Sequence, residues 1–258
     1  MNPVAIGPGQ LLLCLLFVGV AGAASVALRL HLERDLLWGT VRAFAQLFLV
    51  GYVLDIVFAL DRPLLVMAVF VFMVFWAAHA VRGRVRDPQI GVFAPTFVSM
   101  VVSYLAVTTV VTAVVVQVDP WWTPQYFIPL GGMIAGNSMN AISVCLERLL
   151  TGLRERREAI ELALSLGATY REATADLLAE AVRAGMIPSI NALMTVGLVS
   201  LPGMMTGQIL AGVAPVSAVK YQIVVMLMLV ASTAIGSVVV AAVVRRRCFT
   251  SSQQLILH

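Results

Sequence analysis

Seven long apolar stretches limit the folds that this sequence can adopt. They cover residues 11–28, 43–60, 64–81, 92–118, 126–146, 187–213 and 222–244. A helix needs about 20 mostly apolar residues to cross the hydrocarbon core of a bilayer, where the backbone must satisfy its own hydrogen bonds. Only 12% of the 258 residues are charged, against about 25% in soluble domains. The sequence therefore predicts an all-α, polytopic membrane protein with about seven transmembrane helices in one domain, residues 1–258.

The basic residues indicate how these helices are oriented. Lys and Arg gather in the cytoplasmic loops of membrane proteins. Here 15 of the 17 basic residues lie in alternate loops, and the other loops contain only Arg62 and Lys220. This asymmetry predicts an N-terminus outside the cytoplasm and a C-terminus inside it. It also places the segment between the fifth and sixth apolar stretches in the cytoplasm.

That segment is the one long charged part of the chain, and its pattern is helix, break, helix. Residues 154–166 are rich in strong helix formers and lead to Gly167, a residue type that is common just past a helix end. Thr169 followed by Glu172 is a capping-box pattern that starts a second helix. The pattern predicts a helical hairpin.

This hairpin covers residues 152–186, and its second helix has an apolar face that includes Ala173 and Leu177. A charged hairpin with an apolar face, set between membrane helices, is suited to bind a soluble partner. The spacing alone leaves a second interpretation open, in which the hairpin is a solvated loop that joins two membrane helices.

Polar side chains follow two glycine pairs inside the apolar stretches. Residues 132–136 and 203–207 are GxxxG patterns, which allow helices to approach closely. Polar groups at membrane depth are costly unless they pair or line a wet cavity. The residues beside these patterns therefore form a candidate substrate path: Asn137, Asn140, Met204, Met205 and Gln208. The alternative is ordinary helix packing through hydrogen bonds and methionine side chains.

Asp55 is the one acidic residue well inside an apolar stretch. A carboxylate within the membrane is a functional candidate, so Asp55 joins the candidate path. Because it lies near the outer end of its stretch, its side chain can also reach water directly.

Other classes of site are absent from the sequence. It contains no Ser/His/Asp set, no HExxH motif and no P-loop. Its three cysteines have no metal-ligand spacing, and its net charge of +4 is spread over short loops instead of one soluble face. We therefore expect no catalytic site, no metal site, no cofactor and no nucleic-acid partner in this chain.

The charged hairpin resembles the EAA loop, the helix-turn-helix by which ABC-transporter permeases dock on their ATPase subunit. The match covers Glu161, Ala163 and Gly167, and it departs from the motif at Leu162. Longer stretches resemble the FetB-type permease family: 132–139, 166–169, 184–188, 199–210 and 219–224. The resemblance extends over nearly the whole chain and is specific in its second half.

The resemblance implies a multi-pass permease of the bacterial inner membrane that exports iron. Two copies would work with separate ATPase subunits, which bind ATP and Mg²⁺. The motif and the hairpin pattern together indicate seven ATPase-coupling residues. They are Glu161, Ala163, Gly167, Thr169, Glu172, Ala173 and Leu177. Other interpretations stay open: an ABC permease for another substrate such as a nucleotide sugar, a stand-alone secondary transporter or channel, and a membrane enzyme acting on lipid.

Overall fold

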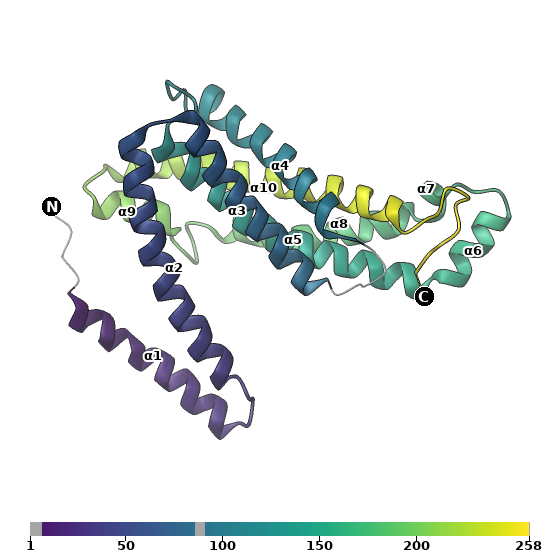
Figure 1. The fold of residues 1–258 in the computed structure, drawn as a ribbon, viewed down its shortest axis with the longest axis horizontal. Helices are drawn as coiled ribbons and strands as arrows, with labels where there is room; N and C mark the ends of the chain where they lie inside the picture. The colour runs from purple at the N-terminus through teal and green to yellow at the C-terminus, as the bar shows by residue number, and fades with distance from the viewer. Residues whose placement is uncertain (1–6, 86–90, 258) are drawn as a thin grey trace. The chain divides into compact units, whose positions relative to one another are not determined.

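The computed structural model of the protein describes residues 7–85 and 91–257, and the regular structure in these ranges is helical (Figure 1). The helices are α1 (Pro8–Ala27), α2 (Glu33–Leu60), α3 (Pro63–Arg84), α4 (Phe93–Val110), α5 (Pro124–Glu155), α6 (Arg157–Ser165), α7 (Tyr170–Ala173), α8 (Ala175–Thr195), α9 (Gly203–Leu210) and α10 (Pro215–Arg247). A π-helical turn, η1 (Val111–Val115), continues α4. Two isolated β-bridges are the only strand-like pairings within the described ranges. The predicted all-α fold is confirmed.

Five helices of the described chain are long and apolar enough to cross a membrane: α1, α2, α3, α4 with η1, and α10. The protein is therefore a polytopic helical membrane protein, as predicted. The fifth and sixth apolar stretches correspond to α5 and to α8 with α9, which fall outside this group. The count of seven spans stays a prediction.

The sixth apolar stretch, residues 187–213, is not one helix. α8 ends at Thr195, Val196 is extended, and Gly197 has a φ of +81°. Proline is a common helix breaker, but the carbonyl of Pro202 accepts the N–H of Thr206 in α9 (3.0 Å). The helix therefore stops well before Pro202, and this proline lies at the start of the next helix.

The chain forms two compact units, which are described here one at a time. In the first, α1 packs against α2, and Ser25 holds the turn between them. The Ser25 hydroxyl donates to Glu33 Oε1 and accepts the N–H of Leu32, both at 3.0 Å. The second unit contains α3 to α8, α9 up to Ile209, and α10. That residues 1–258 act as one transmembrane domain stays a prediction.

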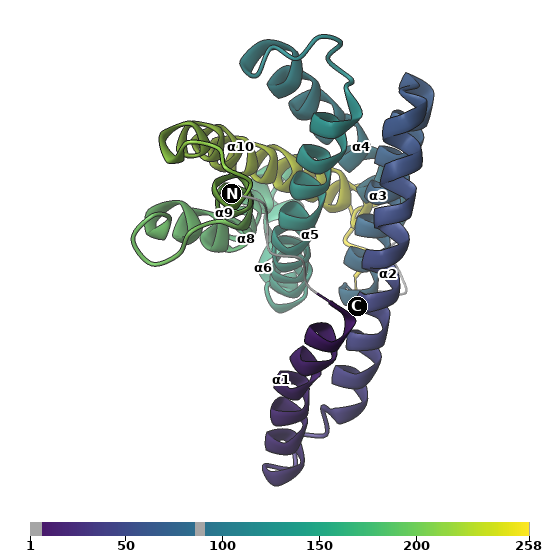
Figure 2. The ribbon, with the colours of Figure 1, turned by 90° about the vertical axis from the view of Figure 1, so that its left-hand side faces the viewer.

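α5 is the central helix of the second unit and packs against α3, α4, α8 and α10 (Figure 2). Its apolar side chains recur at helical spacing and are fully buried, as Ile142, Leu146 and Leu149 illustrate. α8 approaches most closely at Gly185, where an added Cβ would lie 2.6 Å from the carbonyl oxygen of Ala141. Glycine at this position therefore lets α8 touch the backbone of α5.

α5 extends well beyond the basic end of α3. Arg84, the last residue of α3, donates from Nη1 to Oδ1 of Asn140 in α5 at 2.6 Å. From Asn140, α5 continues to Glu155, which is about 22 Å farther at 1.5 Å per residue. Arginine side chains at the end of a membrane helix stay at the water interface. The hairpin that follows α5 thus lies outside the hydrocarbon core, while the side of the membrane that it faces stays a prediction.

Candidate functional site

The predicted helical hairpin is present at the end of α5. α5 and α6 are separated by the single non-helical residue Arg156, and α6 leads to Gly167. Gly167 has a φ of +97°, a backbone conformation that L side chains rarely adopt. Thr169 then accepts the N–H of Glu172 on its hydroxyl (3.3 Å) and donates its own N–H to Glu172 Oε2 (2.8 Å). The glycine turn and the capping box are both confirmed.

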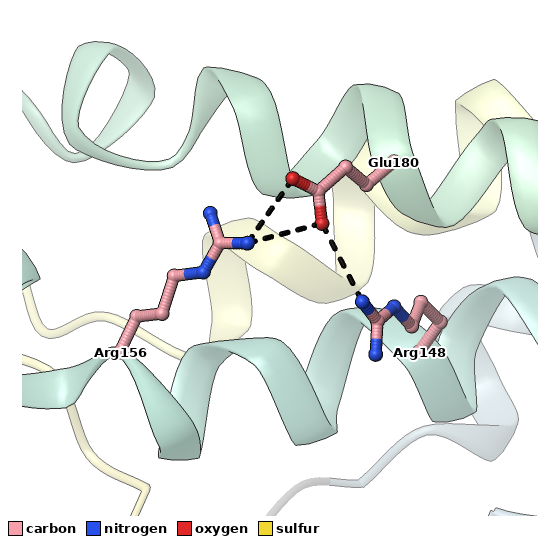
Figure 3. Close-up of polar contacts among 3 residues, drawn as sticks. All are labelled: Arg148, Arg156 and Glu180. Atoms are coloured by element: carbon pink, nitrogen blue, oxygen red, sulfur yellow. Dashed lines mark hydrogen bonds and ion pairs between the residues drawn. The ribbon is translucent and has the colours of Figure 1, made fainter.

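Three charged residues fasten the base of the hairpin (Figure 3). Arg156 Nη2 donates to both carboxylate oxygens of Glu180 in α8, at 3.1 and 3.3 Å. Arg148 Nη2 in α5 lies 3.6 Å from the same carboxylate. All three side chains are 41–51% exposed, so each pair contributes about 0–1 kcal/mol to stability. They link α8 to α5 at the surface, while the buried face of α8 holds the two helices together.

Most of the predicted coupling residues lie on or near the surface of the hairpin. Glu161 is exposed and accepts a hydrogen bond from Arg157 Nε at 2.7 Å. Ala163 and Ala173 are half-buried. Hydrogen bonds from the backbone N–H and hydroxyl of Thr169 lower the pKa of the Glu172 carboxyl. The capping box therefore keeps a negative charge at the start of the second helix.

Leu177 has a different environment from the one expected. It is 5% exposed, and one of its methyl carbons lies 2.9 Å from where a Cβ on Gly152 would be. With Ala181 and Gly185 it forms the buried face of α8 that packs on α5. The apolar pattern of this helix thus reflects packing inside the chain, and Leu177 supports the hairpin from within instead of presenting a surface to a partner.

The exposed apolar surface of the hairpin lies on α6 and the turn after it. Leu162 is 61% exposed and Leu166 is 80% exposed, while Ile160 on the opposite side is buried. Residues four apart in a helix lie on one face, so these two leucines form a small apolar patch beside Gly167. Sequence reasoning noted Leu162 only as a departure from a motif and missed Leu166.

The candidate path residues on α5 lie on its exposed side. Asn137 donates from Nδ2 to the carbonyl oxygen of Met133 at 3.0 Å, and Asn140 accepts the hydrogen bond from Arg84. Asn140 therefore lies at the level of the basic end of α3. The two asparagines give α5 an exposed polar stripe.

The other candidate path residues lie on α9 and α2. Met205 is buried, Met204 and Gln208 are half-buried, and Gln208 Oε1 has no hydrogen-bond partner among the described atoms. α9 is not among the closely packed helix pairs, so a substrate path shared with Asn137 and Asn140 stays a prediction. Asp55 is exposed on α2 and belongs to the first unit. Its part in the substrate path stays a prediction.

The two GxxxG patterns do not join the fifth and sixth apolar stretches. A Cβ on Gly132 would lie 2.5 Å from Met73 Cε, so this glycine packs on α3. Gly136, Gly203 and Gly207 have no atom within 4 Å of an added Cβ. Close contact between α5 and α8 comes instead from Gly185, which lies outside both patterns.

A group of buried hydroxyls lies where α4, α5 and α10 pack together, and sequence reasoning missed it. Ser138 Oγ and Thr233 Oγ1 are 3.3 Å apart, and Tyr104, Thr108 and Ser237 are also buried. Single hydroxyl residues inside apolar helices commonly bond across helix interfaces and have no distinctive spacing. The described residues contain no group of three His, Cys, Asp or Glu side chains that could hold a metal ion.

Comparison with known proteins gives relatives over almost the whole chain. The model of the Uncharacterised protein family (UPF0014) matches residues 8–249. The chain is 40% identical to "UPF0014 membrane protein slr1647" of Synechocystis over 93% of this chain and 94% of the relative. It is 36% identical to "Probable iron export permease protein FetB" of Escherichia coli over 100% of this chain and 98% of the relative. It is also 36% identical to "UPF0014 membrane protein YjkA" of Bacillus subtilis, over 95% of this chain and 97% of the relative. No solved structure matches.

Proposed function

The chain belongs to the UPF0014 family of membrane proteins, and from this premise we propose that it is the membrane subunit of an ABC transporter. In this proposal the chain forms a homodimer and docks two separate ATPase subunits, which bind ATP and Mg²⁺. The cargo is iron or a related metal ion, which leaves the cytoplasm through the bacterial inner membrane. The relative in Escherichia coli is named a probable iron export permease, and this name supports the choice of cargo.

One observation supports the ATPase partner above the others, namely the exposed apolar patch on the hairpin. Leu162 and Leu166 are exposed at the end of a segment that is otherwise charged and lies outside the hydrocarbon core. The size of the patch suits a shallow groove on a soluble subunit, with a polar rim provided by neighbours such as Glu161.

The hairpin is connected to the membrane helices in a way that suits energy transfer. Its first end continues α5 and its second end continues α8, and both helices pack tightly on each other. When ATP closes the ATPase pair, a docked hairpin moves with it, and α5 and α8 move as one body. The membrane region then changes between inward-open and outward-open states, a two-state equilibrium biased by a ligand.

The first test removes the apolar patch. Replacing both Leu162 and Leu166 with Ser should leave the protein folded in the membrane, because both side chains are exposed. It should abolish co-purification of an ABC ATPase subunit that the unaltered protein retains. Ala179→Ser is the matched control, since Ala179 is exposed on the second helix of the hairpin. Undiminished co-purification of the double variant would show that α6 is not the docking surface.

The second test concerns the proposed path. Amide oxygens suit harder cations and thioethers suit softer ones, so a mixed lining would pass a borderline metal without trapping it. Met204→Leu with Met205→Leu keeps the side-chain volume and removes sulfur, and Gln208→Leu removes the amide. Metal efflux from cells or proteoliposomes should fall in both variants while expression and ATPase assembly persist. If efflux is unchanged in both, these residues serve only in packing.

A further inference from the structure

The end of the chain folds into an ordered loop after α10. We call residues 248–257 the C-terminal loop. After α10, the N–H of Ile256 donates to the carbonyl oxygen of Cys248 (2.8 Å), and that of Thr250 donates to the carbonyl oxygen of Gln254 (2.9 Å). Three apolar side chains of the loop are buried, namely Phe249, Leu255 and Leu257, while Ile256 is exposed. Buried apolar residues at a chain end indicate that the loop is held in place by its neighbours.

Those neighbours are the residues of the hairpin turn, and Tyr170 is the centre of the contact. Tyr170 is the first residue of α7, so its N–H has no acceptor within the helix. It donates instead to Gln253 Oε1 at 2.8 Å. The rings of Tyr170 and Phe249 have centroids 5.3 Å apart. From the other side of the turn, Arg157 Nη1 donates to the carbonyl oxygen of Leu257 at 3.2 Å.

α10 itself also reaches this tyrosine. The guanidinium carbon of Arg245, in the last turn of α10, lies 5.7 Å from the centroid of the Tyr170 ring. Arg245 is only 8% exposed, and a cation over an aromatic ring is worth more when it is shielded from water. Between the turn and the C-terminal loop is an open cavity of about 670 Å³, lined by residues of both, among them Gly167 and Gln253.

We propose that the C-terminal loop is a positioning element of the coupling hairpin: through Tyr170 it joins α10 to the hairpin turn, so that movement of the hairpin reaches α10 as well as α5 and α8. This inference rests on the proposed function, because it assumes that an ATPase moves the hairpin. The residues that join the loop and α10 to the hairpin turn all belong to this chain: Tyr170, Arg245, Phe249 and Gln253.

The need for a third attachment follows from the size of the hairpin. α6 has nine residues and α7 has four, and isolated helices this short are unstable in water. Covalent links to α5 and α8 hold the two ends of the segment but not its turn. α10 packs along α4, α5 and α8, so a turn fastened to α10 cannot move independently of the membrane helices. Without the loop, part of the hairpin movement would be lost at the turn.

The experiment uses the full-length protein reconstituted with its ATPase and measures transport, ATP hydrolysis and ATPase co-purification together. Gln253→Leu removes the acceptor for the Tyr170 N–H, and Phe249→Ala removes the ring contact. Both variants should retain the ATPase and its hydrolysis, while transport per ATP falls about fivefold or more, the usual lower range of coupling between sites. Gln253→Glu keeps the acceptor oxygen and should restore coupling, and Ser251→Ala, an exposed neighbour in the loop, is the control.

The outcomes separate this inference from the proposed function. If the unaltered protein recruits no ATPase, the proposed function fails, whatever the loop does. If it recruits the ATPase but Gln253→Leu and Phe249→Ala transport normally per ATP, the loop is passive and the inference fails. Loss of ATPase binding by Gln253→Leu would also overturn it, because the loop would then belong to the docking surface. Gln253 is exposed, so its variant stays informative even if Phe249→Ala does not fold.

Discussion

Gly185→Val should prevent α8 from packing on α5 and leave the protein unable to fold stably in the membrane. The first added carbon would lie 2.6 Å from the carbonyl oxygen of Ala141 and 3.0 Å from the Cβ of Cys145. Real Cβ atoms essentially never come within 3.0 Å of another heavy atom, and a helix backbone cannot rotate away as a flexible side chain can. The two helices would have to separate.

The consequence is large because this contact is at the centre of the second unit. Overpacking a tight interface typically costs about 1–3 kcal/mol, and more where backbone atoms must shift. In a membrane, close packing is itself a main source of helix association. Separating α8 from α5 would also uncover side chains that are now buried at this contact, such as Cys145 and Leu177.

Thermal unfolding of the purified protein in detergent measures this effect. Gly136→Val is the matched control, because it adds the same side chain to a glycine of α5 with no atom within 4 Å of the new carbon. We expect a normal unfolding temperature for Gly136→Val and a protein that aggregates or unfolds far below it for Gly185→Val. Equal unfolding temperatures would mean that α8 and α5 do not meet at Gly185.

Gly167→Val should have the second largest effect, on coupling instead of on folding. A β-branched residue at a φ of +97° is strained by roughly 1–3 kcal/mol. The turn lies at the surface and has open space around Gly167, so the hairpin can relieve the strain by changing shape. If only the present shape fits the ATPase, that penalty weakens binding by about 5- to 150-fold.

Co-purification of the ATPase, measured at several concentrations, detects such a change. Gly167→Asn is the control, since asparagine tolerates positive φ better than other residues, and it should retain most of the binding. Both variants should reach the membrane in normal amounts. Full ATPase binding and transport by Gly167→Val would mean that the hairpin is only a linker.

The parts of the hairpin that were predicted correctly depend on local chemistry. Gly167 marks a turn because few other residues adopt its backbone conformation, and Thr169 with Glu172 caps a helix through contacts three residues apart. Such features are encoded in a few neighbouring residues, so a sequence displays them directly. The same reason explains why the long apolar stretches predicted a helical membrane protein.

Features that depend on partners distant in sequence were not predictable in this way. The apolar face containing Leu177 has the same pattern whether it packs on α5 or on another protein. Gly185 has no glycine partner four residues away, so no motif distinguishes it from a helix glycine in open space. The C-terminal loop lacks helical or strand periodicity, and its order comes from Tyr170, a residue far away in sequence.

The extension of α5 beyond α3 has a mechanical consequence. The contact of Asn140 with Arg84 divides this helix into arms of about 24 Å toward Pro124 and about 22 Å toward Glu155. A stiff rod that tilts by about 10° around this fulcrum moves each tip by roughly 4 Å, in opposite directions. If an ATPase pulls on the hairpin as proposed, arms of nearly equal length would move the Pro124 end of α5 as far as the Glu155 end, in the opposite direction.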